Sequence, residues 1–146
     1  MLALCLVPAL PAVPHQLIVP FFKDDGGNIV DSVPPLGGVA GFVVVRNTRG
    51  ESVTMYLVYT QADPSGAVVM QQAVPFTLAA YGVVNFRPTK NDPIEGDSRV
   101  VPNMLPGLGS EGSLTIIWVG GPEMVSALVG RYQQLSSGSD MDHVLF

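Results

Sequence analysis

The sequence predicts an all-β fold, a single antiparallel β-sandwich of about seven to eight strands, either immunoglobulin-like or jelly-roll-like. Short apolar runs alternate with turns, and 16 Gly and 13 Pro are spread between them. Hydrophobic residues make up 47% of the 146 residues, so the chain can bury one sizeable core. The regular spacing of strands and turns is typical of a sandwich. We expect a domain at 16–135, an extended apolar N-terminal arm at 1–15 and a tail at 136–146.

The arm is the run MLALCLVPALPAV at residues 1–13, which resembles the hydrophobic stretch of a secretory signal without its basic leader. Pro8, Pro11 and Pro14 interrupt it well short of the roughly 20 residues that span a bilayer, so we expect no transmembrane segment. The segment is either a signal remnant or a structural arm. A structural arm packs on its own domain or on a neighbouring copy.

The first strands are predicted at residues 16–22, 39–47 and 52–61. Pro20 cannot donate to a ladder, so 16–22 is predicted to be an edge or bulged strand. The run at 39–47 is nearly continuously apolar, as in a strand covered on both faces. Residues 52–61 alternate with period two. Their two faces carry Val53, Met55, Leu57 and Tyr59 on one side and Thr54, Tyr56, Val58 and Thr60 on the other.

A turn at residues 62–66 predicts a hairpin, with a return strand at 67–78. The corner Tyr81-Gly82 leads into a strand at 82–87. Residues 88–113 form a long irregular loop, which in a compact domain is usually functional or packed against something.

Two more strands, 112–119 and 123–134, are expected to pair around Gly120-Gly121-Pro122. A helix is the competing interpretation of 123–134, but Gly130 and the Val content favour a strand. The tail begins with the linker-like residues 136–140 and ends in an apolar sequence.

Three strings between Gly41 and Pro88 resemble bacterial extracellular domains of the immunoglobulin-like kind. They are the strand end Asn47-Thr48, the Val/Thr-rich strand at 52–60, and the Thr-Leu-X-X-X-Gly corner at 77–83. The flanking strings at 19–27 and 87–96 look like those of uncharacterised secreted bacterial proteins. The resemblance covers about a third of the chain. It implies an immunoglobulin-like fold and a secreted or cell-surface location, and it implies no activity.

The charge balance argues against nucleic acid as a partner. The chain has 7 basic and 12 acidic residues, a net charge of −5 and a pI near 4.7. It therefore has no basic patch to neutralise a phosphate backbone. The single Cys5 excludes an internal disulfide framework, and its apolar neighbours favour inert packing.

Two loops carry carboxylate and amide oxygens, the ligands that Ca²⁺ prefers. They are Asp24, Asp25, Asn28 and Asp31 in the first loop, and Asn91, Asp92, Glu95 and Asp97 in the second. Neither loop has the alternating spacing of an EF-hand. We expect solvated turns, with no cofactor, and keep a calcium site as the alternative.

The chain is not expected to be an enzyme. Its only histidines, His15 and His143, lie near the chain ends, and it has no Gly-X-Ser-X-Gly turn. Asp140, Asp142 and His143 have the chemistry of metal ligands, but in a Ser/Gly tail they favour a solvated segment. A glycan could stack on an exposed aromatic ring. The candidates are Trp118, Tyr56, Tyr59, Tyr81 and Tyr132, of which Trp118 is expected in the core and only one of Tyr56 and Tyr59 can face outward.

Self-association has more support. Only 13% of the residues are charged, against about 25% in typical domains, and the mean hydropathy is +0.37. This apolar surplus predicts surface that is buried against other copies. The residues expected to join subunits are Leu2, Leu4, Leu6, Val7, Leu10, Val13, Leu145 and Phe146.

We therefore expect a structural, self-assembling subunit of an extracellular or surface filament, layer or shell, joined through its apolar termini and through exchange of strands or arms. A viral coat protein with a jelly roll is a variant of this hypothesis. The alternative is a monomeric secreted β-sandwich that binds Ca²⁺ or carbohydrate.

Overall fold

A computed structural model describes residues 12–24, 38–62, 65–88, 111–136 and 139–145. These ranges contain eight strands and one short 3₁₀ helix, which confirms the all-β prediction. The elements are β1 (Val13–Lys23), β2 (Val39–Asn47), β3 (Val53–Ala62), β4 (Val68–Leu78), β5 (Val83–Phe86), β6 (Glu111–Gly120), η2 (Pro122–Met124), β7 (Leu128–Ser136) and β8 (Ser139–Leu145). No helix within these ranges has the length and apolar character needed to cross a membrane.

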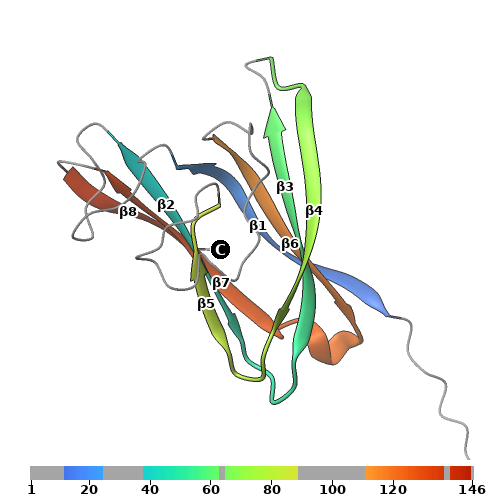
Figure 1. Cartoon of the computed structure of the whole chain (residues 1–146). Coiled ribbons are helices and arrows are strands. Elements are labelled where there is room, and N and C mark those ends of the chain that lie inside the picture. Colours follow the sequence, from blue (N-terminus) through green and yellow to red (C-terminus); the bar gives the residue numbers. More distant parts are fainter. Residues whose placement is uncertain (1–11, 25–37, 63–64, 89–110, 137–138, 146) are drawn as a thin grey trace, which may run out of the picture.

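The strands form two antiparallel four-stranded sheets, which lie as two layers in Figure 1. Sheet A has the order β1-β6-β3-β4, and sheet C has the order β5-β2-β7-β8. Of the connections between the described strands, only β3–β4 and β7–β8 stay within one sheet, and the other five cross from one layer to the other. The predicted β3–β4 hairpin is confirmed, and its tip rises beyond the rest of the strands (Figure 1).

Both sheets contribute to one hydrophobic core. Alternation places one face of each strand against the opposite sheet, and β3 shows this most clearly. The predicted alternation is confirmed, and the four residues of the inward face are at most 3% exposed: Val53, Met55, Leu57 and Tyr59. Trp118 from β6 and Phe86 from β5 fill the same core, so the predicted burial of Trp118 is confirmed.

Strand β2 is covered on both faces over most of its length, as its continuous apolar run predicts. It lies between β5 and β7. Val43 and Val45 belong to the main core, whereas Ala40 and Phe42 form a second cluster with Leu135.

The prediction that residues 112–119 and 123–134 pair with each other is wrong. Strand β6 pairs with β1 and β3, whereas β7 pairs with β2 and β8. Residues 122–124 form a 3₁₀ turn, and the strand begins only at Leu128. The Trp118 indole N–H donates to the Met124 carbonyl at 2.7 Å, and the Met124 N–H donates to the Gly121 carbonyl at 2.9 Å. These bonds make the connection a corner between the sheets, where a hairpin was expected.

Strand β8 lies in the segment whose composition predicts a flexible tail. It pairs with β7 through a tight connection, with Ser136 opposite Ser139 and Arg131 opposite Leu145. At the other end of the domain, β1 begins at Val13, so the last residues of the predicted arm belong to sheet A. Residues 1–11 lie outside the described part.

Candidate interaction surface

The outer face of sheet A carries charged side chains only at one end, where Lys23 of β1 lies opposite Glu111 of β6. Register places Gln16, Ile117, Tyr56 and Pro75 side by side in one row across the sheet. The neighbouring row contains Ile18, Thr115, Val58 and Ala73. The rest of the face, without that charged end, comprises Pro14, Gln16, Ile18, Pro20, Thr54, Tyr56, Val58, Thr60, Gln71, Ala73, Pro75, Thr77, Ser113, Thr115, Ile117 and Val119. We call this surface the uncharged face; none of its residues is buried.

Large apolar side chains on this face remain open to solvent. Tyr56 is 49% exposed, Ile18 is 43% exposed and Val119 is 57% exposed. A solvent-facing sheet normally alternates buried apolar residues with outward polar or charged ones. Here the outward positions hold β-branched, aromatic and hydroxyl side chains instead.

The polar groups of the uncharged face bond partly with one another. The hydroxyl oxygens of Thr54 and Thr77 lie 2.9 Å apart across β3 and β4. The Gln71 amide donates to the Thr60 hydroxyl at 3.2 Å. These cross-strand pairs leave the face with fewer hydrogen-bonding groups for a partner than its composition alone suggests.

A depression of about 220 Å³ lies at one end of the face. Its lining is Pro20, Phe21, Thr60, Ala62, Glu111, Gly112 and Ser113. The pairing of β1 with β6 shifts register between Val19 and Phe22, which confirms the bulge predicted at Pro20, and Phe21 is 54% exposed there. The charged side chains on this side of sheet A lie at this rim, where the Lys23 amine is 3.1 Å from the Glu111 carboxylate.

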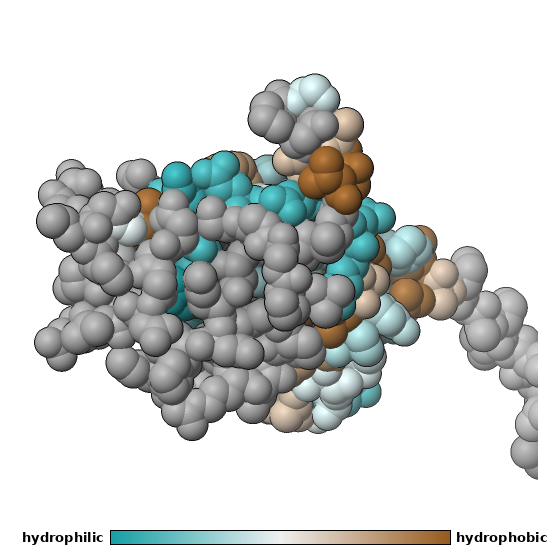
Figure 2. All heavy atoms as spheres, turned by 45° about the horizontal axis from the view of Figure 1, so that its top comes forward, coloured by the Kyte–Doolittle hydropathy of each residue, from teal (hydrophilic) through white to brown (hydrophobic). Residues whose placement is uncertain are grey.

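The projecting hairpin adds more apolar surface to sheet A. Val68 and Val69 are 61% and 56% exposed, and hydrophobic residues reach the surface just below the hairpin tip in Figure 2. Strand β4 is an edge strand without a charged residue, and only Pro75 interrupts its donors.

The residues predicted to join subunits are placed only in part. Val13 is 46% exposed at the start of β1, on the same sheet as the uncharged face. Leu145 lies in β8 opposite Arg131. The others, Leu2, Leu4, Leu6, Val7, Leu10 and Phe146, lie outside the described residues.

Of the predicted calcium ligands, the structure describes Asp24 alone. This carboxylate is fully buried and accepts a hydrogen bond of 2.9 Å from Arg87 Nε, and it also pairs with Arg87 Nη2. Asp25, Asn28 and Asp31 lie outside the described residues, as does the second acidic loop. Among the residues that are described, no three His, Cys, Asp or Glu side chains group as metal ligands would.

The Asp24–Arg87 pair is a structural bond between the sheets, and the sequence analysis missed Arg87. Asp24 follows β1 of sheet A and Arg87 follows β5 of sheet C. Nearby, the Lys23 amide donates to the Tyr132 hydroxyl at 3.0 Å. Burial raises the pKa of Tyr132, the Lys23 amide lowers it, and the charge of Asp24 raises it further.

Asn47 is fully buried at the end of β2 and forms hydrogen bonds to two loops. It belongs to one of the strings that resemble immunoglobulin-like domains. Its amide donates to the carbonyls of Glu51 and Ala79 at 2.7 and 2.8 Å, and to that of Leu78 at 3.3 Å. Its side-chain oxygen accepts from the Arg49 amide at 2.9 Å. Two of the three strings are therefore in direct contact, because Leu78 and Ala79 lie in the Thr-Leu-X-X-X-Gly corner.

The corner itself requires an unusual backbone. Tyr81 has φ 55°, in the left-handed region, and its N–H donates to the Arg49 carbonyl at 2.9 Å. The Tyr81 ring is 64% exposed at this end of the molecule, away from Tyr56. Tyr59 and Tyr132 are both buried, so of the tyrosines only Tyr56 lies on the uncharged face.

The histidines occupy separate places. His15 packs against Trp118 with ring centroids 5.6 Å apart, and its Nε2 lies 3.1 Å from the Gly121 carbonyl oxygen. His143, Asp140 and Asp142 lie on β8, where only the backbone is described. Cys5 lies outside the described residues.

Comparisons with protein-family models, with curated proteins and with solved structures gave no match to this chain.

Proposed function

We propose that this protein is a non-enzymatic, secreted or cell-surface structural subunit, a β-sandwich of the immunoglobulin-like kind that assembles with copies of itself. The uncharged face of sheet A is the observation that carries the proposal. It spans four strands and stops short of the one charged pair on this side of the sheet, Lys23–Glu111, in a chain whose net charge is −5. The secreted location is supported by the signal-like apolar run and by the resemblance to secreted bacterial domains.

Electrostatics favours a second copy as the occupant of this face. Copies with the same negative charge repel each other in general, and the repulsion is weakest where the facing surfaces carry no charge. The centres of protein interfaces are depleted of Lys, Glu and Asp and enriched in aromatic residues. Tyr56, at 49% exposure and with Ile117 and Pro75 beside it, has the character of such a centre.

The edges of sheet A support the same function. Strand β4 presents uncharged edge groups, and β1 continues from the apolar N-terminal segment with Val13 exposed. A neighbouring copy could pair with such an edge or accept the arm, since edge strands offer unpaired backbone donors and acceptors.

The solution mass of the full chain tests the proposal, with 15.4 kDa as the monomer. We expect a mass several times larger by light scattering, and we expect Tyr56→Lys and Thr115→Lys to shift the protein to smaller species. Val125→Lys is the matched control, because Val125 is 66% exposed but lies off the face. A wild-type monomer, or assembly that both face variants leave intact, would refute the proposal.

A monomeric carbohydrate-binding module is the second candidate. It is supported by one observation, the half-exposed ring of Tyr56 on a flat surface that also holds Gln16 and Gln71. It predicts a monomer whose migration in a polysaccharide-containing native gel is retarded, and Tyr56→Ala would abolish the retardation. If the monomeric module binds Ca²⁺ instead, its melting temperature should be higher with Ca²⁺ than without. An unchanged melting temperature would count against calcium binding.

A further inference from the structure

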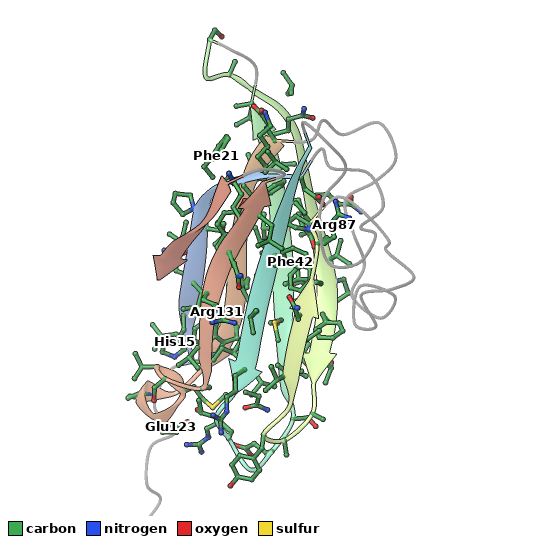
Figure 3. The ribbon with its side chains drawn as sticks, turned by 90° about the vertical axis from the view of Figure 1, so that its left-hand side faces the viewer. His15, Phe21, Phe42, Arg87, Glu123 and Arg131 are labelled. Atoms are coloured by element: carbon green, nitrogen blue, oxygen red, sulfur yellow. The ribbon has the colours of Figure 1, made fainter. Side chains whose placement is uncertain are left out.

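The outer face of sheet C holds two arginines on neighbouring strands. Arg46 of β2 lies between Val83 and Val129, and in the next row Val44 lies between Asn85 and Arg131 of β7. The two arginines are therefore diagonal neighbours, with their backbones about 7–8 Å apart. Figure 3 looks onto this sheet and labels Arg131.

An open depression of about 260 Å³ lies between the two arginines. Its lining is Val44, Arg46, Val129, Gly130 and Arg131. Val129 is 45% exposed, and Val83 beside Arg46 is 56% exposed, so the apolar part of the wall is open to solvent. The site thus combines an apolar floor with two guanidinium groups.

These arginines differ from the other described cations in their pairing. Lys23 pairs with Glu111, Arg49 with Glu51, and Arg87 with Asp24. Within the described part of the chain, neither Arg46 nor Arg131 forms an ion pair. Two like charges on adjacent strands repel each other, and a bound anion would remove that repulsion.

We propose that this depression binds a carboxylate attached to a small apolar body. The planar guanidinium fork matches a carboxylate in geometry, and two forks can hold one carboxylate from both sides. Val44 and Val129 would contact the hydrocarbon part. Ligand pockets usually enclose about 300–1,000 Å³, so the depression accommodates the head group and a few carbons, and the rest of a longer ligand would extend over Val83.

The apolar floor distinguishes this ligand class from a free inorganic anion. A fully hydrated phosphate would lose water against Val44 and Val129 and gain no hydrogen bond from them. An uncharged amphiphile would contact the valines but leave the two guanidinium groups unpaired. Affinity for the carboxylate and the apolar body together is therefore the signature of the site.

The test is a titration of the full-length protein with octanoate, kept below its micelle concentration and followed by calorimetry. Octanamide and inorganic phosphate are the matched probes. We expect saturable octanoate binding and at least tenfold weaker binding of both other probes. Arg46→Gln and Arg131→Gln should each weaken octanoate binding roughly tenfold or more, since each removes a charge-assisted hydrogen bond. Arg49→Gln, which changes a partly exposed arginine at the β2–β3 turn, should leave octanoate binding unchanged.

Three outcomes would overturn the proposal. They are no octanoate binding, phosphate binding as tight as octanoate binding, and octanoate binding that neither Arg46→Gln nor Arg131→Gln weakens. The inference is independent of self-assembly, because Tyr56 lies on the other sheet. Octanoate should therefore bind Tyr56→Lys with unchanged affinity, whether or not that variant assembles.

Discussion

The outer faces of the two sheets follow the same alternation but carry different chemistry. On sheet A the outward positions are occupied by hydroxyl, amide, apolar and aromatic side chains, with Tyr56 near the centre. On sheet C, Arg46 and Arg131 stand among valines in the corresponding outward positions. Period-two patterning determines which side chains point outward, and the identity of a few outward residues then determines what each face can bind. We propose that one face binds a copy of the chain and that the other binds a carboxylate.

The buried Asp24–Arg87 pair is one of the links between the two sheets. Replacing Arg87 by Met leaves the buried Asp24 carboxylate without its cation, and we expect a loss of about 3–5 kcal/mol in the free energy of unfolding. Urea denaturation measures the loss. The control is Lys23→Gln, which breaks the more exposed pair with Glu111 and should cost less than about 1 kcal/mol. Equal costs for both variants would contradict a structural role for the buried pair.

The next largest effect concerns the opposite end of the two sheets. Asn47→Ala deprives the carbonyls of Glu51 and Ala79 and the amide of Arg49 of their partner. We expect a loss of about 1–3 kcal/mol, because these partly buried groups and the buried Leu78 carbonyl lose a hydrogen bond. Gln71→Ala, on the exposed face of β4, should change stability by less than about 0.5 kcal/mol in the same urea experiment.

The stability of the fold at alkaline pH depends on one buried tyrosine in each sheet. Burial raises the pKa of Tyr59 in sheet A and of Tyr132 in sheet C, so the folded protein retains phenol protons that the unfolded chain releases above about pH 10. Stability is therefore complete below pH 10 and falls as the pH rises above it. Tyr59, whose pKa is raised most, contributes up to about 1.4 kcal/mol per pH unit in this range.

The fall in stability should be less steep in Tyr59→Phe than in the wild type. Urea midpoints at pH 9, 10 and 11 measure the slope. Parallel profiles for the two proteins would show that Tyr59 ionises as freely in the folded chain as in the unfolded one.

The smallest expected effect comes from a variant that removes the difference in charge between the two outer faces. Arg46→Thr combined with Arg131→Thr makes the outer face of sheet C resemble that of sheet A. If lack of charge promotes association, this double variant should form larger species than the wild type, with a dissociation constant lower by up to about fivefold. Sedimentation at several concentrations measures it. An unchanged distribution would mean that shape, and not charge, distinguishes the faces.

Much of the fold was predictable because its signals are local. The alternation in β3, the continuous apolar run of β2 and the bulge at Pro20 depend on neighbouring residues, and the structure has all three. The partners of β6 and β7 were not predictable, because strand pairing between segments far apart in sequence leaves no local pattern. Strand β8 was missed because its Ser/Asp composition resembles a linker.

The functional surfaces, like the fold, were predictable only in part. The absence of charge at alternate positions of β3 and β4, and of β6 after Glu111, is visible in the sequence, but its meaning emerges only when register places those positions on one face. The sequence analysis placed assembly at the chain ends instead. Arg87 and Asp24 are 63 residues apart, and neither motif nor spacing connects them.

The crossing connections have a consequence for the order of synthesis. Strand β6 lies between β1 and β3, and β7 lies between β2 and β8. When synthesis has reached residue 88, the β3–β4 hairpin is the only pairing of sheet A that can have formed. The slot beside β1 is still empty, because β6 has not yet been made. Such long-range pairing slows folding and leaves strand edges open while the chain is incomplete. A neighbouring nascent chain could supply β6 to that slot, so domain-swapped species should be the characteristic misfolded product at high expression.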